Sequence, residues 1–188
     1  HKKGVLIVAS AGNDDTDRKQ YPAAFSFTVT VAALAPDNTK ASFSNYGSGV
    51  DVCAPGVDVV STFWDGSYVQ WSGTSFAAGI ISGVAAVVAS HAPRLKVDEV
   101  ARAIIRSGRS VDAENPQYRG KLGPSDGGLV DVTAALAAAD ARGEGGGGGG
   151  APDNGGGAPD DGDGPDDDDD DDGDGGGRGR GRDGRRPR

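Results

Sequence analysis

The amino-acid composition changes abruptly at Glu144, and this change limits where the chain can form a hydrophobic core. Residues 144–188 contain no Val, Ile, Leu, Phe, Tyr or Trp. Such a segment cannot bury enough apolar surface to offset the entropy lost on ordering, so we expect residues 143–188 to be a disordered tail rich in Gly, Asp and Arg. Residues 1–142 are long enough for one domain and contain all of the large apolar side chains.

The net charge of −9 belongs almost entirely to the tail. Residues 144–188 carry 14 acidic residues and 6 arginines, whereas residues 1–143 are close to neutral. Because the domain has no basic stripe, its composition predicts no nucleic-acid partner.

Apolar segments separated by turn residues predict alternating strands and helices. Val5–Ala9 is a continuous apolar run, typical of a parallel strand buried between helix layers. Further strands are expected at Phe27–Leu34, within 50–56 and within 58–63, helices at Ser75–Ala92 and Lys96–Gly108, and a short strand and final helix within 128–143. The first helix is apolar nearly all round, which indicates a central buried helix. We therefore expect an α/β domain with a mainly parallel sheet.

Cys53 is the single cysteine, which excludes an internal disulfide bond. It lies among apolar residues, so we expect a buried, unreactive thiol. The longest mostly apolar run, Gly79–Ala89, is too short to cross a bilayer, and the sequence predicts no membrane span. The chain begins at His1 and contains no Met, which indicates a fragment or a processed piece, so a signal peptide could have been lost.

Ser75 lies in the stretch SGTSFAAGIISG, where small residues lead directly into the expected apolar helix. A serine in the first turn of a helix has an exposed hydroxyl, and its backbone N–H lacks an intrahelical partner. That N–H could stabilise the oxyanion formed when the hydroxyl attacks a carbonyl group. Gly73 would let the backbone approach a substrate closely. Taken alone, Ser75 could equally be an ordinary N-cap, a role that Thr74 could also fill.

Asn13 follows the first expected strand, in the loop ASAGND. Its side-chain amide could donate to the same oxyanion as the Ser75 N–H, although alone it could be a turn residue beside Asp14. The short elbow Gly-x-Ser-x-Gly is absent because Ala77 stands two residues after Ser75, which disfavours an α/β-hydrolase.

Five blocks of the sequence together resemble the subtilisin-like serine proteases, the subtilase family. VASAGND resembles the family's oxyanion block, YPAAF the Tyr-Pro segment after it, and ASFSNYGSGVDVCAPGVDVVST the stretch that ends in Ala-Pro-Gly and Ser-Thr. SGTSFAAGIISGVAA resembles the nucleophile block, and GGLVDVTAAL the closing strand and helix. The blocks occur in the family's order. The resemblance implies the C-terminal part of a subtilase catalytic domain, with a partial three-layer subtilisin-like fold.

The resemblance implies a serine endopeptidase site in which Ser75 is the nucleophile and Asn13 the side-chain donor of the oxyanion hole. The residues implied to contact a polypeptide substrate are Ala9, Ser10, Ala11, Gly12, Asp14, Gly73 and Thr74. Asp14 would lie at the mouth of the pocket for the side chain that precedes the scissile bond, where its charge could favour basic residues. It could also be a solvated loop carboxylate.

The family has a cis peptide bond at the position of Tyr21–Pro22, so the resemblance implies a cis bond here. Some members bind a cation weakly through backbone carbonyls that match those around Ala23, Phe25 and Thr28. The resemblance therefore allows a structural calcium ion, whereas the chemistry itself requires no cofactor.

The Asp and His of the family's triad belong to blocks upstream of the oxyanion block, and this sequence contains neither block. His1 lacks the family's His-Gly-Thr surroundings, and His91 is expected about 20–25 Å from Ser75 along the helix. Without a general base Ser75 attacks poorly, so we expect the chain alone to be inactive and to need the N-terminal part of the catalytic domain as a partner.

The resemblance also implies a secreted or cell-surface protein, and it allows a propeptide as a further partner. Two other interpretations stay open. The chain could be a pseudoprotease module that binds peptides as an added strand without chemistry. It could instead be a nonfunctional truncation whose uncovered face is prone to aggregate.

Overall fold

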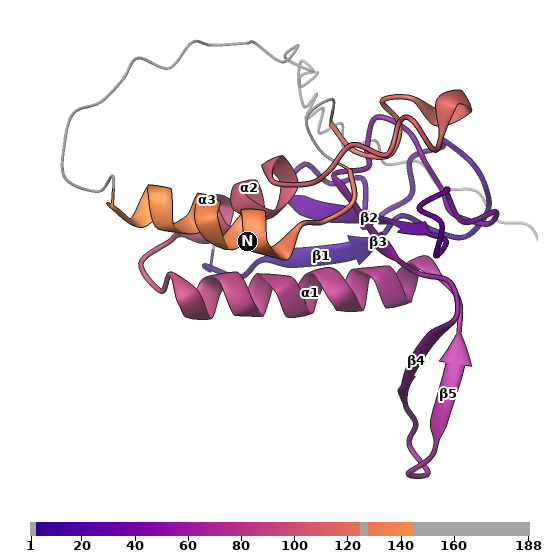
Figure 1. The fold of residues 1–188 in the computed structure, drawn as a ribbon, viewed down its shortest axis with the longest axis horizontal. Helices are drawn as coiled ribbons and strands as arrows, with labels where there is room; N and C mark the ends of the chain where they lie inside the picture. Colours follow the sequence, from indigo (N-terminus) through magenta and orange to yellow (C-terminus); the bar gives the residue numbers. More distant parts are fainter. Residues whose placement is uncertain (1–2, 125–127, 145–188) are drawn as a thin grey trace, which may run out of the picture. The chain divides into compact units, whose positions relative to one another are not determined.

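The structure is a computed structural model of the 188-residue chain, and it describes residues 3–124 and 128–144 (Figure 1). The chain divides into two units, residues 1–149 and 150–188, and all described residues belong to the first. The expected tail lies outside the described residues beyond Glu144. In chain order the elements are β1 (Ile7–Ser10), β2 (Thr28–Leu34), β3 (Val52–Pro55), β4 (Val59–Thr62), β5 (Tyr68–Trp71), α1 (Thr74–His91), α2 (Val97–Arg106), the short 3₁₀ helix η1 (Pro116–Tyr118) and α3 (Val132–Glu144).

β1, β2 and β3 form a parallel sheet in that order, with Ile7 paired to Thr28 and Val31 paired to Val52. Every residue of β2 is buried, which fits its central position and its β-branched and small apolar side chains. β1 is half-buried, and its outer edge has no strand partner among the described residues. The expected α/β class with a parallel sheet is confirmed.

Alternate side chains of the sheet pack into two apolar clusters, because successive side chains of a strand point to opposite faces. Val31 and Ala33 belong to the larger cluster, together with residues from all three α-helices. Ala32 and Leu34 face the opposite way and pack against apolar residues of the connection between α2 and α3. Both faces of the sheet are therefore covered, as its continuous apolar strands predicted.

α1 lies against the sheet and contacts α2 and α3 (Figure 1). Ala77, Ile81 and Val88 are completely buried on one side of the helix. Its other side is exposed to solvent and includes Gly79, Ser82, Gly83, Ala86 and Val87. The prediction of a helix buried all round is therefore wrong, because no described segment covers this second side.

α1 is also the one described helix that is long and apolar enough to cross a membrane, with a mean hydropathy of 1.5 over 18 residues. The core helix of a globular domain passes the same test of length and composition. The buried side of α1 contributes to the larger apolar cluster, so its apolar character has a structural explanation within this domain.

Carboxylates define the starts of α2 and α3. The Glu99 carboxylate accepts the N–H of Lys96 at 2.8 Å, and the Asp131 carboxylate accepts the N–H of Ala134 at 2.9 Å. The strand expected before α3 does not form, which corrects the sequence prediction. Leu129 instead divides its pairing between two partners and makes isolated bridges to Cys53 and Arg109.

β4 and β5 form an antiparallel hairpin that projects from the N-terminal end of α1 (Figure 1). The sequence predicted a strand within 58–63 but not its partner β5. Phe63 contacts Trp71 edge to face, with ring centroids 5.3 Å apart, whereas Trp64 and Tyr68 are 86% and 74% exposed. The hairpin leads directly into the first turn of α1.

Candidate active site

The carboxyl end of the sheet and the N-terminal end of α1 bring Asn13 and Ser75 to the same part of the domain. Asn13 lies in the loop that follows β1, and Ser75 is the second residue of α1. Gly56 connects the sheet to the helix, since its N–H donates to the Leu34 carbonyl at 3.0 Å and its carbonyl accepts the Gly73 N–H at 2.8 Å. The edge at the carboxyl ends of the strands is where open α/β sheets place their sites.

Glycine is required at position 56 by this close approach. A Cβ at Gly56 would lie 2.5 Å from the Cβ of Ala33 and 3.0 Å from the Gly73 carbonyl oxygen. Real Cβ atoms do not come so close to other heavy atoms, so any side chain here would push the start of α1 away from β2.

Thr74 fixes the orientation of the Asn13 side chain. The Asn13 Oδ1 atom accepts the backbone N–H of Thr74 at 3.0 Å and its hydroxyl at 2.8 Å. A backbone N–H can only donate, so the atom facing it must be the amide oxygen. The Thr74 hydroxyl in turn accepts the N–H of Gly12 at 3.3 Å. Thr74 is completely buried, which holds this arrangement away from competing water.

The Nδ2 atom of Asn13 consequently points away from Thr74 and makes no hydrogen bond within residues 3–124 and 128–144. The positions of the two donors can be compared at Gly73. A Cβ atom placed on Gly73 would lie 3.8 Å from Asn13 Nδ2 and 3.8 Å from the Ser75 backbone nitrogen. The two donors therefore flank one small volume beside Gly73. Ser75 and Asn13 are both exposed, so this volume is open to a ligand.

The loop implied to contact the substrate has a neighbour that the sequence did not indicate. Gly12 has a φ of 107°, and a Cβ there would lie 2.4 Å from the Gln20 Oε1 atom. The Gln20 Nε2 atom donates to the Asp14 carboxylate at 2.6 Å. Gln20 thus lies against Gly12 and donates to the Asp14 carboxylate, which is exposed to solvent. Of the other residues implied to contact the substrate, Ala11 is buried and Ala9 and Ser10 are the half-buried end of β1.

Asn45 is the second residue that the sequence did not single out. Its Oδ1 atom accepts the N–H groups of Asp14 at 2.9 Å and Thr16 at 3.2 Å, and its Nδ2 atom donates to the Ala11 carbonyl at 2.9 Å. Asn45 is 2% exposed. It lies in a turn-rich stretch with several polar residues, and no local pattern distinguishes it as the one that reaches back to the loop.

His91 is the one histidine within the described residues, and it does not lie near Ser75. It is the last residue of α1, and its Nε2 atom is 2.7 Å from the Asp140 carboxylate of α3. His1 lies outside the described residues. No described imidazole is therefore available at the Ser75 end of the helix to act as a general base.

The Tyr21–Pro22 peptide bond is cis, as the resemblance implied. The segment after it lines a cavity of about 220 Å³, whose walls include Ala23, Phe25, Thr28 and Asp51. The Thr28 hydroxyl is buried and has no hydrogen-bond partner among the described residues. Burial raises the pKa of the Asp51 carboxyl, although a hydrogen bond from the Thr30 N–H opposes this shift.

These groups fit a weakly held oxygen-liganded cation. Calcium prefers oxygen ligands, and the residues that line the cavity carry one carboxylate and several hydroxyl groups besides backbone carbonyls, while Lys19 in the same lining carries an opposing charge. The Ala23 carbonyl already accepts the Thr30 hydroxyl at 2.6 Å, and the Phe25 carbonyl accepts the Thr28 N–H at 3.0 Å, so each has one remaining lone pair. The described residues contain no cluster of three or more His, Cys, Asp or Glu side chains that could hold a metal ion more firmly.

The fold and the two donors fit the class of serine hydrolases that stabilise an oxyanion at a helix N-terminus. The comparisons with known proteins define the family. The subtilase family profile matches residues 1–153, so the chain belongs to the subtilase family of serine proteases. Subtilases use no chemical cofactor.

The most similar relatives are proteases. Over 81 residues the chain is 52% identical to halolysin of Haloferax mediterranei, which covers 43% of this chain and 16% of halolysin. Over 91 residues it is 42% identical to subtilisin Savinase of Lederbergia lenta, covering 48% of this chain and 34% of that protein. A solved protease structure from Pseudoalteromonas arctica superposes with a TM-score of 0.64 at 33% identity, covering 73% of this chain and 44% of that one. The chain thus spans less than half the length of these proteins.

Proposed function

We propose that this chain supplies the nucleophile and the oxyanion hole of a subtilisin-type serine endopeptidase. The observation that carries the proposal is the pair of hydrogen bonds from Thr74 to the Asn13 oxygen. They direct the amide N–H₂ of Asn13 toward the volume that the Ser75 N–H also borders. The substrate-contacting residues of the proposal are those that the resemblance implied, Ala9, Ser10, Ala11, Gly12, Asp14 and Gly73; Thr74, also implied, is completely buried and acts instead through its hydrogen bonds to Asn13.

In the proposed reaction the Ser75 hydroxyl oxygen attacks the carbonyl carbon of a peptide bond. Its proton passes to a general base, and the carbonyl oxygen becomes an oxyanion that accepts hydrogen bonds from Asn13 Nδ2 and the Ser75 N–H. The base then returns the proton to the departing amine, and water releases the acyl group from Ser75. The described residues supply the nucleophile and both donors, but they do not supply the base.

The test uses a catalytic domain completed with the N-terminal half of a related subtilase. Asn13→Ala should lower kcat with little change in KM, because the lost hydrogen bond forms only in the transition state. Subtilisin is the standard example of this loss, about 10²–10³ in kcat. Gln117→Ala, which removes an exposed amide from η1, is the matched control. An Asn13→Ala variant with unchanged kcat would refute the oxyanion role.

The proposal also predicts that the chain alone is inactive, since removal of a triad member leaves only the contribution of the oxyanion hole and of binding. A fluorophosphonate probe should fail to label Ser75 in the isolated chain. Labelling at the rate of an intact serine protease would contradict this expectation. If the completed domain binds peptides but does not cleave them, the pseudoprotease interpretation takes its place.

We also propose that the rest of the catalytic domain docks on the open edge of β1 and the exposed side of α1. A groove of about 670 Å³ runs between them and is mainly apolar, with Val5, Ile7, Ala86 and Ala89 among its lining residues. Exposed backbone groups of an edge strand accept another strand, and the apolar walls require cover. The solved structures that this chain matches support a domain about twice as long as the matched part of the chain, since 73% of the chain covers 51% and 44% of two of them.

Docking can be tested by mixing the chain with a separately produced N-terminal half. We expect a 1:1 complex and protection of the Ile7–Ser10 amides from hydrogen exchange. Val8→Pro, which removes one N–H donor of the edge strand, should weaken the complex. Association that leaves the β1 amides unprotected would place the interface elsewhere.

Three further features belong to the proposal. The substrate is an extended polypeptide, and Asp14 favours a basic side chain before the scissile bond by charge pairing. The cavity beside Asp51 holds a structural calcium ion. The protein acts outside the cell or at its surface. Residues 1–142 are its catalytic portion and residues 143–188 a separate tail. A propeptide is a further partner.

A further inference from the structure

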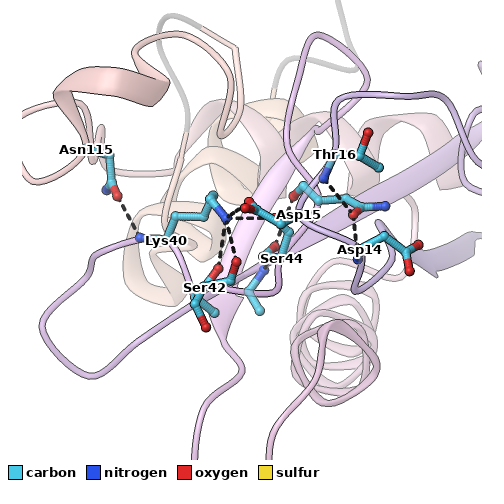
Figure 2. A network of polar contacts seen from close by, with 10 residues as sticks. Asp14, Asp15, Thr16, Lys40, Ser42, Ser44 and Asn115 are labelled. Carbon is cyan, nitrogen blue, oxygen red and sulfur yellow. Dashed lines mark hydrogen bonds and ion pairs between the residues drawn. The ribbon is translucent and has the colours of Figure 1, made fainter.

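A buried lysine lies directly beneath the loop that carries Asn13. The side chain of Lys40 is 2% exposed, although lysine is among the residues least often buried. Its Nζ atom donates to the Asp15 carboxylate at 2.7 Å, and to the carbonyls of Ala41 at 3.0 Å and Ser44 at 2.9 Å (Figure 2). The Ser42 carbonyl lies at 3.3 Å as a fourth acceptor. An ammonium group thus occupies a cradle of oxygen atoms.

Two tyrosines complete the surroundings of this ammonium group. The Lys40 Nζ atom lies 4.8 Å from the ring centroid of Tyr118 and 5.4 Å from that of Tyr46, within the range of cation–π attraction. The Lys40 backbone N–H donates to Asn115 Oδ1 at 2.6 Å. Both the charge and the main chain of Lys40 are therefore fixed by residues from other segments.

Asp15 connects Lys40 to the loop that carries Asn13. It has a φ of 49°, in the left-handed region, and its N–H donates to the Phe43 carbonyl at 2.9 Å. Asp15 is two residues after Asn13, and Asn45 binds the N–H groups on either side of it, those of Asp14 and Thr16. Segment 40–46 thus holds the loop through the Lys40 ammonium group, the Asn45 side-chain amide and backbone hydrogen bonds.

We propose that Lys40, acting through Asp15, is a positioning residue for the oxyanion hole. The Lys40–Asp15 ion pair holds the loop on the 40–46 segment, while Thr74 holds Asn13 on α1, so the Asn13 amide is fixed from both sides. Lys40 touches no substrate. Among the described residues Lys40 pairs with Asp15, and no lysine pairs with Asp14 beside it. The effect on catalysis rests on the proposed function. The fixing of residues 12–16 by the Lys40–Asp15 ion pair, here called the clamp, can be measured in this chain by itself.

The clamp is tested first in the 188-residue chain by amide hydrogen exchange. Lys40→Met keeps the length of the side chain but removes the ammonium group. We expect exchange of the amides in 12–16 to become about 10- to 100-fold faster, the factor that corresponds to the loss of a charged hydrogen bond. The amides of β2 and of the middle of α1 should be unchanged. Lys121→Met is the matched control, because it removes an exposed ammonium 5.4 Å from the Tyr46 ring.

A second variant covers the case in which Lys40→Met does not fold. Asp15 is 53% exposed in its side chain, and Asp15→Asn keeps its shape and its tolerance of a positive φ. It should accelerate exchange in the same five residues to a smaller extent. Unchanged exchange in both variants overturns the proposal, and so does equal acceleration throughout the chain, which would assign Lys40 to general stability.

The completed catalytic domain gives the second readout. Asp15→Asn should lower kcat while KM stays nearly constant, since the loop donates mainly in the transition state. If Asn13→Ala leaves kcat unchanged, the proposed function fails, but the exchange experiment still decides whether the clamp exists. If Asn13→Ala lowers kcat and Asp15→Asn does not, the positioning role alone is refuted.

Discussion

Thr74 determines which end of the Asn13 amide faces solvent, and this is the smallest feature on which the proposed chemistry depends. The residue is buried, and its hydroxyl both donates to Asn13 and accepts from Gly12. A hydroxyl can serve both partners at once, which a methyl group of the same size cannot.

Thr74→Val should therefore destabilise the chain and loosen Asn13. The substitution keeps the shape of the side chain but removes the acceptor of the Gly12 N–H and a donor to Asn13. We expect the free energy of unfolding in urea to fall by about 1–3 kcal/mol, the cost of an unpaired buried polar group. Thr74→Ser, which keeps the hydroxyl, should recover most of this loss. Equal losses in the two variants would mean that packing of the methyl group is what matters.

Cys53 provides a prediction about reactivity. The thiol is buried and donates to the Leu122 carbonyl at 3.0 Å, and burial raises its pKa to about 12. At pH 8 its thiolate fraction is then roughly 10³ lower than that of a free cysteine, whose pKa is about 8.5. A disulfide reagent should react with the native chain at least that much more slowly than with the urea-unfolded chain. Rapid reaction of the native thiol would show that this part of the core opens.

The same thiol has a defined effect on stability against pH. Because its pKa is higher in the folded chain, the unfolded chain loses the proton first. The free energy of unfolding should therefore fall as the pH rises above about 8.5, with a limiting slope of about 1.4 kcal/mol per pH unit from this group. The difference between wild type and Cys53→Ala, measured from pH 7 to 10, isolates this contribution. A constant difference over that range would contradict it.

At this scale the sequence singled out Ser75 and Asn13 as candidates, but not three of the residues that contact the Asn13 loop. Each could be explained locally, Ser75 as an N-cap and Asn13 as a turn residue. Only the resemblance to the subtilases assigned them to one site. Gln20, Lys40 and Asn45 act through contacts with a loop that is distant in the chain; the Asn45 bond to Asp14 spans 31 residues. Neither composition nor periodicity reports such a contact, because each depends on neighbouring residues alone.

At the scale of elements, α1 has one side that packs on the sheet and one that is open. Gly79 and Gly83 lie on the open side, and a Cβ at either position would meet nothing within 4 Å. Glycine within a helix costs about 1 kcal/mol relative to alanine, so both residues weaken the helix without a packing reason in the described structure.

Gly79→Ala and Gly83→Ala should each stabilise the isolated chain, by about 0.5–1 kcal/mol in urea unfolding. Each should also weaken association with the N-terminal half, since the proposed docking brings a close-packed surface onto this side. Ser90→Ala, at an exposed position near the end of the same helix, is the control for helix propensity. Stabilisation without loss of association would mean that the glycines lie outside the interface.

The helices were predicted more accurately than the hairpin. α1 and α2 begin and end within two residues of their expected bounds, because apolar spacing, Pro93 and Gly108 mark them. β5 was missed since its residues are largely exposed and show no alternation of buried and exposed positions. The prediction of a strand before α3 was wrong, because a short apolar segment can equally form isolated bridges, as Leu129 does with Cys53 and Arg109.

At the scale of the whole molecule, the calcium ion proposed for the cavity beside Asp51 would couple stability to calcium concentration and to pH. The raised pKa of Asp51 means that the folded chain without a cation disfavours the ionised carboxyl. A bound cation requires that ionised form. Calcium should therefore raise the melting temperature at neutral pH, and the increase should disappear as the pH falls through the raised pKa of Asp51.

The size of the effect follows from mass action. A calcium concentration about 100 times Kd stabilises by about 2.7 kcal/mol, which corresponds to several degrees in a domain of this size. Asp51→Asn should abolish the shift, whereas Asp17→Asn, which removes a carboxylate exposed to solvent, should preserve it. An increase that persists in Asp51→Asn would locate the cation at another site.

The direct contacts to the loop that carries Asn13 come from within one continuous stretch, between Ala11 and Thr74, and Asn115 and Tyr118 support Lys40 from outside it. Under the proposed function, an oxyanion pocket assembled in this way would be ready before the N-terminal half docks, and that half would contribute the proton acceptor. With the two halves supplied as separate polypeptides, the rate of peptide cleavage at low occupancy should rise with the product of their concentrations, and dilution should suppress it.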